Sequence, residues 1–216
     1  MSQARRAVPV IVTLFLIGAP ACKGSVPPSP PPTSATPEAA PPTKRVVGPL
    51  SEADAAALAT MNDGLKKYVE LHTKMEAALP KLPVNATPMQ RDTVQRQFEK
   101  SLRAARIDAR QGDLFTAEAQ PVIKRLVAAV FDGPNGQKLK ASIMDENPTG
   151  LHLSVNGRYP DTVPISTMPP PVLQTLPKLS EDMEYRFVGD ALIIFDSHAH
   201  IIADFIDNVL PPTRQP

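Results

Sequence analysis

The chain has 216 residues, of which 42% are hydrophobic and 21% are charged, and its formal net charge is +1. This balance argues against a nucleic-acid-binding protein, which usually carries a basic excess on one face. Because Cys22 is the only cysteine, an intrachain disulfide and a multi-cysteine metal site are both excluded.

The first 21 residues have the pattern of a signal peptide. Two arginines precede an apolar run at 7–19, and Ala19 and Ala21 take the small-residue positions of a cleavage site. The run is shorter than the roughly 20 apolar residues that a membrane-spanning helix needs. We therefore expect residues 1–21 to be removed and the mature protein to be exported.

The sequence Ala19-Pro20-Ala21-Cys22 resembles the processing site of bacterial lipoproteins, in which the cysteine becomes the lipidated N-terminus. The resemblance implies a lipid anchor on Cys22, in the cell membrane or outer membrane, facing the periplasm or the cell surface. The alternative is an ordinary Ala-x-Ala cleavage site, which would release a secreted or periplasmic protein without lipid.

Residues 22–48 are rich in proline, interspersed with serine, threonine and alanine. Such a segment cannot bury enough apolar surface to fold, and it is typical of semi-rigid extended spacers. We expect a disordered tether at 22–48, one globular domain at 49–212 and a short tail at 213–216. The domain is long enough to bury a sizeable core.

A long helix is predicted from Ser51, an N-cap followed by acidic residues, to the stop at Pro80. Its apolar positions recur at spacings of three and four, which is typical of a helix packed on another helix. The next helix follows after a short loop, so we expect this partner in the same chain and a monomeric protein. The seam consists of Leu58, Met61, Leu65, Tyr68, His72, Met75 and Leu79.

The second helix should begin at Thr87-Pro88-Met89-Gln90, a capping box with proline in the first helical position. Further helices are predicted from about Thr116 to Phe131 and over 135–144, with a proline-bounded helical turn within 169–179.

Strands are predicted after these helices. Alternating polarity at 151–155 indicates a half-buried strand. The runs 184–188 and 191–195 are separated by Gly189-Asp190, which indicates a hairpin, and 199–206 is a third run. The predicted fold class is α+β, with N-terminal antiparallel helices packed on a small C-terminal antiparallel sheet, a meander.

The segment Leu192–His200, which reads Leu-Ile-Ile-Phe-Asp-Ser-His-Ala-His, resembles the first-strand motif of amidohydrolase-type metal hydrolases. In that family an apolar strand ends in His-x-His. The resemblance implies that His198 and His200 ligate a metal that activates water, with Asp196 beside them.

Two histidines leave a zinc ion short of its third protein ligand. One hypothesis is a site assembled from His152, His198, His200 and an acid such as Asp204. The alternative is a turn at Asp196-Ser197 with both histidines of the pair facing solvent.

Three stretches are similar to segments of uncharacterised exported bacterial proteins, which implies a shared fold but no activity: 112–115, 141–148 and 185–189. We expect a lipid-anchored cell-envelope protein that binds the membrane through Cys22. Its domain should be a non-enzymatic binding or scaffolding domain without cofactor, for a protein or small-molecule ligand that the sequence leaves unknown. The alternative is a metal-dependent hydrolase using His198 and His200.

Overall fold

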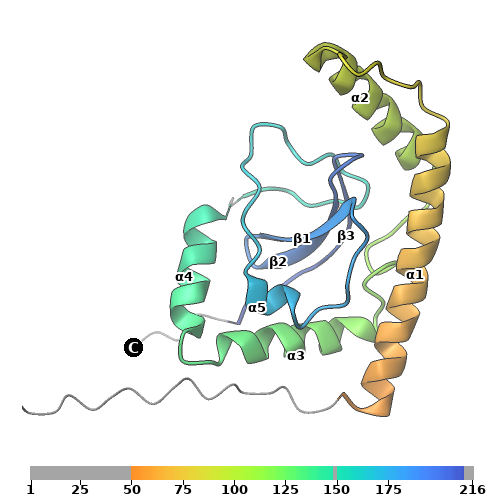
Figure 1. Cartoon of the computed structure of the whole chain (residues 1–216). Helices are drawn as coiled ribbons and strands as arrows, with labels where there is room; N and C mark the ends of the chain where they lie inside the picture. Colours follow the sequence, from red (N-terminus) through yellow and green to blue (C-terminus); the bar gives the residue numbers. More distant parts are fainter. Residues whose placement is uncertain (1–49, 148–149, 212–216) are drawn as a thin grey trace, which may run out of the picture. The chain divides into compact units, whose positions relative to one another are not determined.

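Five helices precede three strands in the part of the chain that the structure, a computed structural model, describes: residues 50–147 and 150–211. The predicted signal peptide, tether and tail lie outside these residues, as does Cys22. No helix among the described residues is long and apolar enough to cross a membrane. The elements are α1 (Glu52–Ala77), α2 (Pro88–Ala105), α3 (Ala119–Phe131), α4 (Gly136–Glu146), α5 (Pro170–Leu173), β1 (Met183–Val188), β2 (Ala191–Asp196) and β3 (Ile201–Ile206) (Figure 1).

The first two helices begin at the capping residues that the sequence predicts. The Ser51 hydroxyl accepts a hydrogen bond from the backbone N–H of Asp54, whose carboxylate accepts one from the N–H of Ser51. Thr87 and Gln90 form the same reciprocal pair at the start of α2. These bonds satisfy N–H groups that the first turn of a helix leaves without partners, so they fix where each helix starts.

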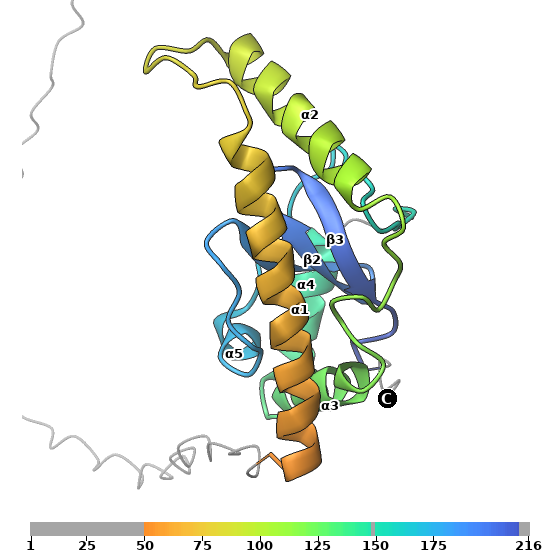
Figure 2. The ribbon, with the colours of Figure 1, turned by 90° about the vertical axis from the view of Figure 1, so that its right-hand side faces the viewer.

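The apolar seam of α1 packs inside the domain. Met61, Leu65 and Tyr68 are buried in the main core together with Phe98 and Leu102 of α2. Helix α1 also packs against α3, which crosses it near its N-terminal end (Figure 2). The predicted intrachain partner is therefore confirmed for this part of the seam.

The three strands form an antiparallel meander in the order β1-β2-β3, as predicted. The β1–β2 hairpin turns at Gly189 and Asp190, with Val188 opposite Ala191. Gly189 has a φ of +60°, a conformation that side chains with a Cβ atom seldom adopt. The observed architecture is α+β, with the helices first and the sheet last.

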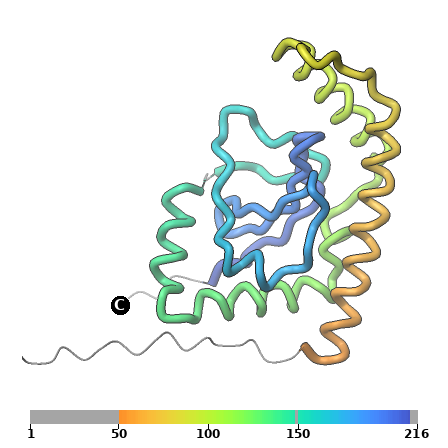
Figure 3. The backbone as a smooth tube through the Cα atoms, in the orientation of Figure 1, coloured from red at the N-terminus to blue at the C-terminus, as the bar shows by residue number. Residues whose placement is uncertain are grey.

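Both faces of the sheet are buried, because every residue of β2 and β3 is buried. Leu192 and Ile194 face the main core with the helices, whereas Ile193 and Phe195 belong to a second cluster with Tyr159. The chain between α4 and β1, whose only regular element among the described residues is α5, contributes to this second layer (Figure 3).

The predicted strand over 151–155 is wrong. Leu151, Leu153 and Val155 are half-buried against the second cluster, but these residues form no strand. Pairing with β3 begins only later, at a single bridge between Arg158 and Ile201. Alternating polarity reports burial on one side of an extended chain, and here the segment packs on the face of the sheet instead of at its edge.

Candidate metal centre

The carboxylate of Asp196, the last residue of β2, has no exposed surface and accepts three hydrogen bonds. Its Oδ2 atom accepts one from the hydroxyl of Tyr68 and one from Nδ1 of His72, each at 2.7 Å. Its Oδ1 atom accepts one from the backbone N–H of Ala199, also at 2.7 Å. Asp196 is thus a fixed buried acceptor, and the sequence pattern that predicts a turn residue here gives no sign of this.

The second ring nitrogen of His72, Nε2, points away from Asp196. The side chain is only 4% exposed, and because Nδ1 donates to Asp196, the neutral ring carries its lone pair on Nε2. Nε2 is buried and has no hydrogen-bond partner among the described residues. It lies 3.6 Å from Oδ2 of Asp182 and 4.0 Å from Oε2 of Glu76, so it faces two carboxylates at distances too long for hydrogen bonds.

The surroundings of His72 act on its pKa in opposite directions. Burial lowers the pKa because it disfavours the charged ring, while the hydrogen bond to Asp196 raises it, as do the charges of Asp196, Asp182 and Glu76. The acidic neighbours outweigh burial, so the pKa of His72 lies above its ordinary value. Burial also raises the pKa of Tyr68, so its hydroxyl stays protonated and keeps donating to Asp196.

His198 lies in the turn after β2 and completes the cluster. Its Nδ1 atom is 3.4 Å from Oε1 of Glu76, and its ring centroid is 5.7 Å from that of His72. Phe98 packs edge-on against both imidazoles, with ring centroids at 4.8 and 4.9 Å. One ligand atom each from His72, Asp182 and His198 lies within 4.8 Å of the other two, close enough for one metal ion.

Three segments of the chain bring these groups together. His72 and Glu76 are one turn apart on α1, so their side chains share a helix face. Asp182 precedes β1, and the backbone N–H and hydroxyl of Ser197 both donate to its carbonyl oxygen. That contact ties the loop before β1 to the turn that carries His198. We refer to His72, Glu76, Asp182 and His198 as the four-residue cluster.

The structure does not bring His200, the other histidine of the predicted pair, into this cluster. His200 has a φ of 59°, and its ring packs on Tyr159 and Phe195 while Nε2 lies 3.3 Å from Asp161. Burial lowers the pKa of His200. The His-x-His spacing places two side chains together only in an extended strand. Here the strand has already ended at Asp196, and the two histidines have different neighbours. Metal binding by this pair stays a prediction.

The remaining candidates, His152 and Asp204, lie elsewhere. Asp204 is buried on β3, where its carboxylate accepts hydrogen bonds from four backbone N–H groups: those of Gly112, Leu114, Phe115 and Phe205. These bonds favour its charged form, although burial raises its pKa. Asp204 therefore anchors the loop before α3. Among the described residues, neither it nor His152 joins a group of three metal-ligating side chains.

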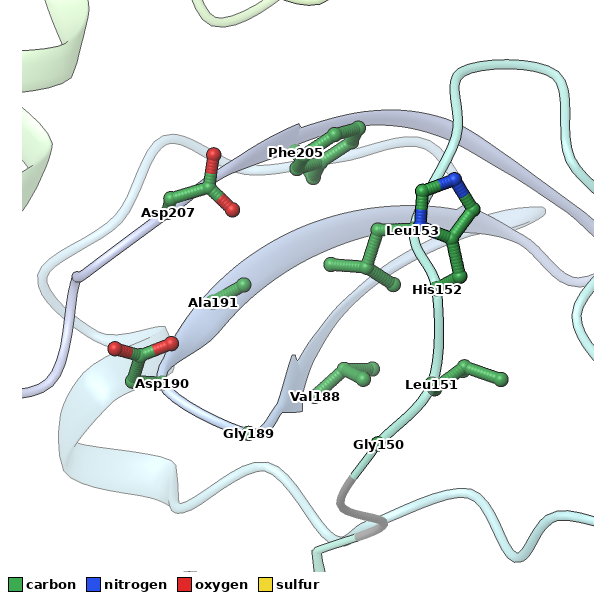
Figure 4. A pocket seen from close by; sticks show the side chains of 10 residues that line it. All are labelled: Gly150, Leu151, His152, Leu153, Val188, Gly189, Asp190, Ala191, Phe205 and Asp207. Carbon is green, nitrogen blue, oxygen red and sulfur yellow. The ribbon is translucent and has the colours of Figure 1, made fainter.

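His152 instead lines a pocket of about 400 Å³ beside the β1–β2 turn (Figure 4). The carboxylates of Asp190 and Asp207 lie on the opposite side of this pocket, and Phe205 and Ala191 contribute apolar surface. The pocket shares no residue with the four-residue cluster.

Sequence reasoning missed most of the cluster, although one signal was available. His72 is the one ionisable imidazole in an otherwise apolar seam, and a buried histidine requires a partner. Glu76 and Asp182 lie outside the apolar seam and are about half exposed, as acidic residues commonly are, so the sequence does not distinguish them from other surface carboxylates.

Comparisons of the chain with family models, curated proteins and solved structures found no match. The four-residue cluster is therefore the feature that bears on function.

Proposed function

We propose that the domain binds one divalent transition-metal ion, with Zn²⁺ as the best fit, at the four-residue cluster. The observation that carries the proposal is the buried Nε2 atom of His72, which has no hydrogen-bond partner among the described residues and faces two carboxylates. A buried polar atom without a partner costs free energy, and a metal ion would satisfy it.

The spacing of the cluster supports this proposal. In a tetrahedral zinc site with ligand bonds of about 2.0–2.1 Å, ligand atoms lie roughly 3.3–3.4 Å from one another. The distances from Glu76 to His198 and from His72 to Asp182 and Glu76 are 3.4, 3.6 and 4.0 Å. The His72–Asp182 distance is close to an edge of such a tetrahedron, and one atom each of His72, Asp182 and His198 lies within 4.8 Å of the other two. Glu76 approaches the two imidazoles with different oxygens, so its carboxylate would have to turn to present one oxygen to the ion. Two imidazoles and two carboxylates are also a donor set that suits zinc.

Asp196 would not contact the metal ion but would orient the ring of His72 that binds it. A histidine that ligates a metal commonly donates its other ring N–H to a carboxylate, which fixes the tautomer and the ring orientation. The His72–Asp196 bond has this arrangement, and Tyr68 and the Ala199 N–H hold the carboxylate in turn. The ion would reach the cluster from solvent past the half-exposed side chains of Asp182 and Glu76.

With Glu76 as a fourth ligand beside His72, Asp182 and His198, the site would bind a metal and leave no open position for a substrate or water. This fits a binding domain better than a hydrolase. The alternative hydrolase would need water in the place of Glu76, whose distance to His72 is the longest of the three. It would use His72 with His198, since His200 points to other neighbours.

For the whole chain we propose an exported protein anchored by lipid on Cys22, with the proline-rich segment as a spacer. The sequence pattern around Cys22 supports this. Expression of the full gene in bacteria, followed by membrane fractionation, tests it with the variant Cys22→Ser. We expect the wild type in the membrane fraction and the variant in the soluble fraction or retained unprocessed, whereas identical fractionation of the two would count against the anchor.

Calorimetric zinc titration of the purified, metal-free full chain tests the metal proposal. We expect one ion per chain for the wild type, and affinity at least about tenfold weaker in the variants His72→Gln and His198→Gln. His152→Gln is the matched control and should bind like the wild type. Zinc binding that survives both substitutions, or no binding by the wild type, would refute the proposal.

A further inference from the structure

The position of Glu76 points to a regulatory role for the metal ion. This inference rests on the proposed function, because it requires that the cluster binds a metal. Residues 73–97 form the outer part of the α1–α2 hairpin, and Figures 1 and 2 both show its loop beyond the sheet. Within 73–97 only Ala86 is buried, and apart from Met75 and Leu79, which are partly buried against the main core, little apolar packing holds this segment. Three large apolar side chains are exposed there: Leu82, Val84 and Met89.

The outer hairpin meets the rest of the domain beside the cluster. Glu76 is the one member of the cluster that belongs to the outer hairpin, and it contacts His198 of the β2–β3 turn. Where the hairpin returns, Phe98 packs on the rings of His72 and His198. Two ion pairs lie nearby, from Arg96 to Asp161 and from Glu99 to Arg158. The first is between half-exposed side chains and should contribute little to holding the hairpin.

The positive charge of a metal ion would strengthen the contact between Glu76 and the β2–β3 turn. Docking the hairpin brings the carboxylate of Glu76 to the ring of His72, which the carboxylate of Asp182 also faces, and like charges that share one site repel each other. A divalent cation between them replaces this repulsion by attraction to all the ligands at once. It would also link α1, the loop before β1 and the β2–β3 turn, which are far apart in the sequence.

We propose that metal occupancy controls the docking of the outer hairpin: the bound ion fixes residues 73–97 against the β2–β3 turn through Glu76, and its loss releases them. The ion would thus set whether the apolar side chains of the hairpin loop are held in one position. Segments with few buried contacts are those that open locally at low free-energy cost, and a ligand that bridges them raises this cost.

Hydrogen–deuterium exchange of the full chain, with and without zinc, tests this proposal. We expect zinc to slow exchange in peptides from 73–97 by at least about tenfold, with a much smaller effect on β1–β3. The variant Glu76→Gln keeps three ligands, so it should still bind zinc, more weakly, but lose the protection of 73–97. Glu70→Gln, an exposed substitution on the same helix, should behave like the wild type.

The outcomes separate the two proposals. If calorimetry shows zinc binding but exchange in 73–97 is unchanged, or slows equally throughout the domain, hairpin control is refuted and the metal site stands. Full protection of 73–97 in zinc-bound Glu76→Gln also refutes hairpin control. If the wild type binds no zinc, the metal site itself is refuted, and hairpin control with it.

Discussion

Nδ1 of His72 lies 2.7 Å from Oδ2 of Asp196, a carboxylate without exposed surface, and this bond joins α1 to the end of β2 across 124 positions of the chain. It fixes the ring of His72 so that Nε2 faces Asp182 and Glu76. The orientation of this one ring underlies the proposed metal site.

Replacing Asp196 by asparagine should weaken zinc binding by about 10–100-fold, because the outer carboxylate orients His72 and increases its basicity. Calorimetric titration at neutral pH measures this change. Asp190→Asn, an exposed substitution in the β1–β2 turn, is the matched control. An affinity equal to that of the wild type would show that Asp196 supports only the fold.

Zinc should raise the thermal stability of the full chain. At a free concentration 100 times its dissociation constant, an ion that binds only the folded state contributes about 2.7 kcal/mol. For a domain of this size that corresponds to a rise in Tm of roughly 5–10 °C. Thermal unfolding followed by circular dichroism checks this, and a chelator should reverse the shift. In the variant His198→Gln, binding weakened tenfold should reduce the contribution at the same zinc concentration to about 1.4 kcal/mol, so its Tm should rise only about half as much or less.

The free energy of unfolding of the metal-free protein should depend on pH in part through the titration of His72. Its folded-state pKa is raised above the ordinary value of 6.5, so its contribution to stability is fully present below pH 6.5. The contribution is lost as pH rises through the folded pKa. Urea unfolding in chelator should therefore give a smaller loss of stability between pH 6 and 8 for His72→Gln than for the wild type. An equal loss in both proteins would contradict the raised pKa.

Zinc binding should have the opposite pH dependence. Imidazole nitrogens bind metal only when deprotonated, so the affinity should fall as pH decreases through the pKa of His72. Zinc titration at several pH values measures this, with His200→Gln as a control that should show the same profile. A pH-independent affinity would exclude imidazole ligands.

The substitution Leu65→Asp should unfold the domain. Leu65 is buried in the main core, and an unpaired buried charge costs several kcal/mol, a large part of the stability of a typical domain. Circular dichroism and sedimentation test this, with Ala59→Asp on the exposed side of α1 as control. A folded variant with altered oligomeric state would show that the seam serves as an interface between chains.

Replacing Asp204 by asparagine should lower the free energy of unfolding by about 1–3 kcal/mol, because several buried N–H groups lose a charged acceptor. Zinc binding should be unaffected, since Asp204 is not part of the cluster. Chemical unfolding compares this variant with Asp145→Asn, an exposed substitution. A simultaneous loss of zinc binding would indicate that the loop before α3 supports the cluster.

Local signals predicted the fold well. The capping boxes at Ser51 and Thr87 determine helix starts through bonds within four residues, and Gly189 permits the tight turn of the hairpin. The segment 151–155 was mispredicted because alternation reveals one-sided burial, whereas strand pairing depends on where the chain meets β3.

The site was predicted less well, because it depends on contacts between distant residues. His198 was a candidate, but its expected partner was His200, two residues away. The positive φ of His200 after the end of β2 breaks the alternation that this pairing requires. The actual neighbour is His72, more than a hundred residues earlier, and only the packing of α1 on the sheet brings the two together.

Anomalous diffraction at the zinc absorption edge, from crystals of the zinc-loaded protein, locates the bound ion itself. We expect one strong peak within about 2.1 Å of Nε2 of His72 and a ring nitrogen of His198, with Asp182 and Glu76 as the remaining ligands. No peak at this position, or a peak at His200 or in the pocket beside His152, would contradict the proposed metal site.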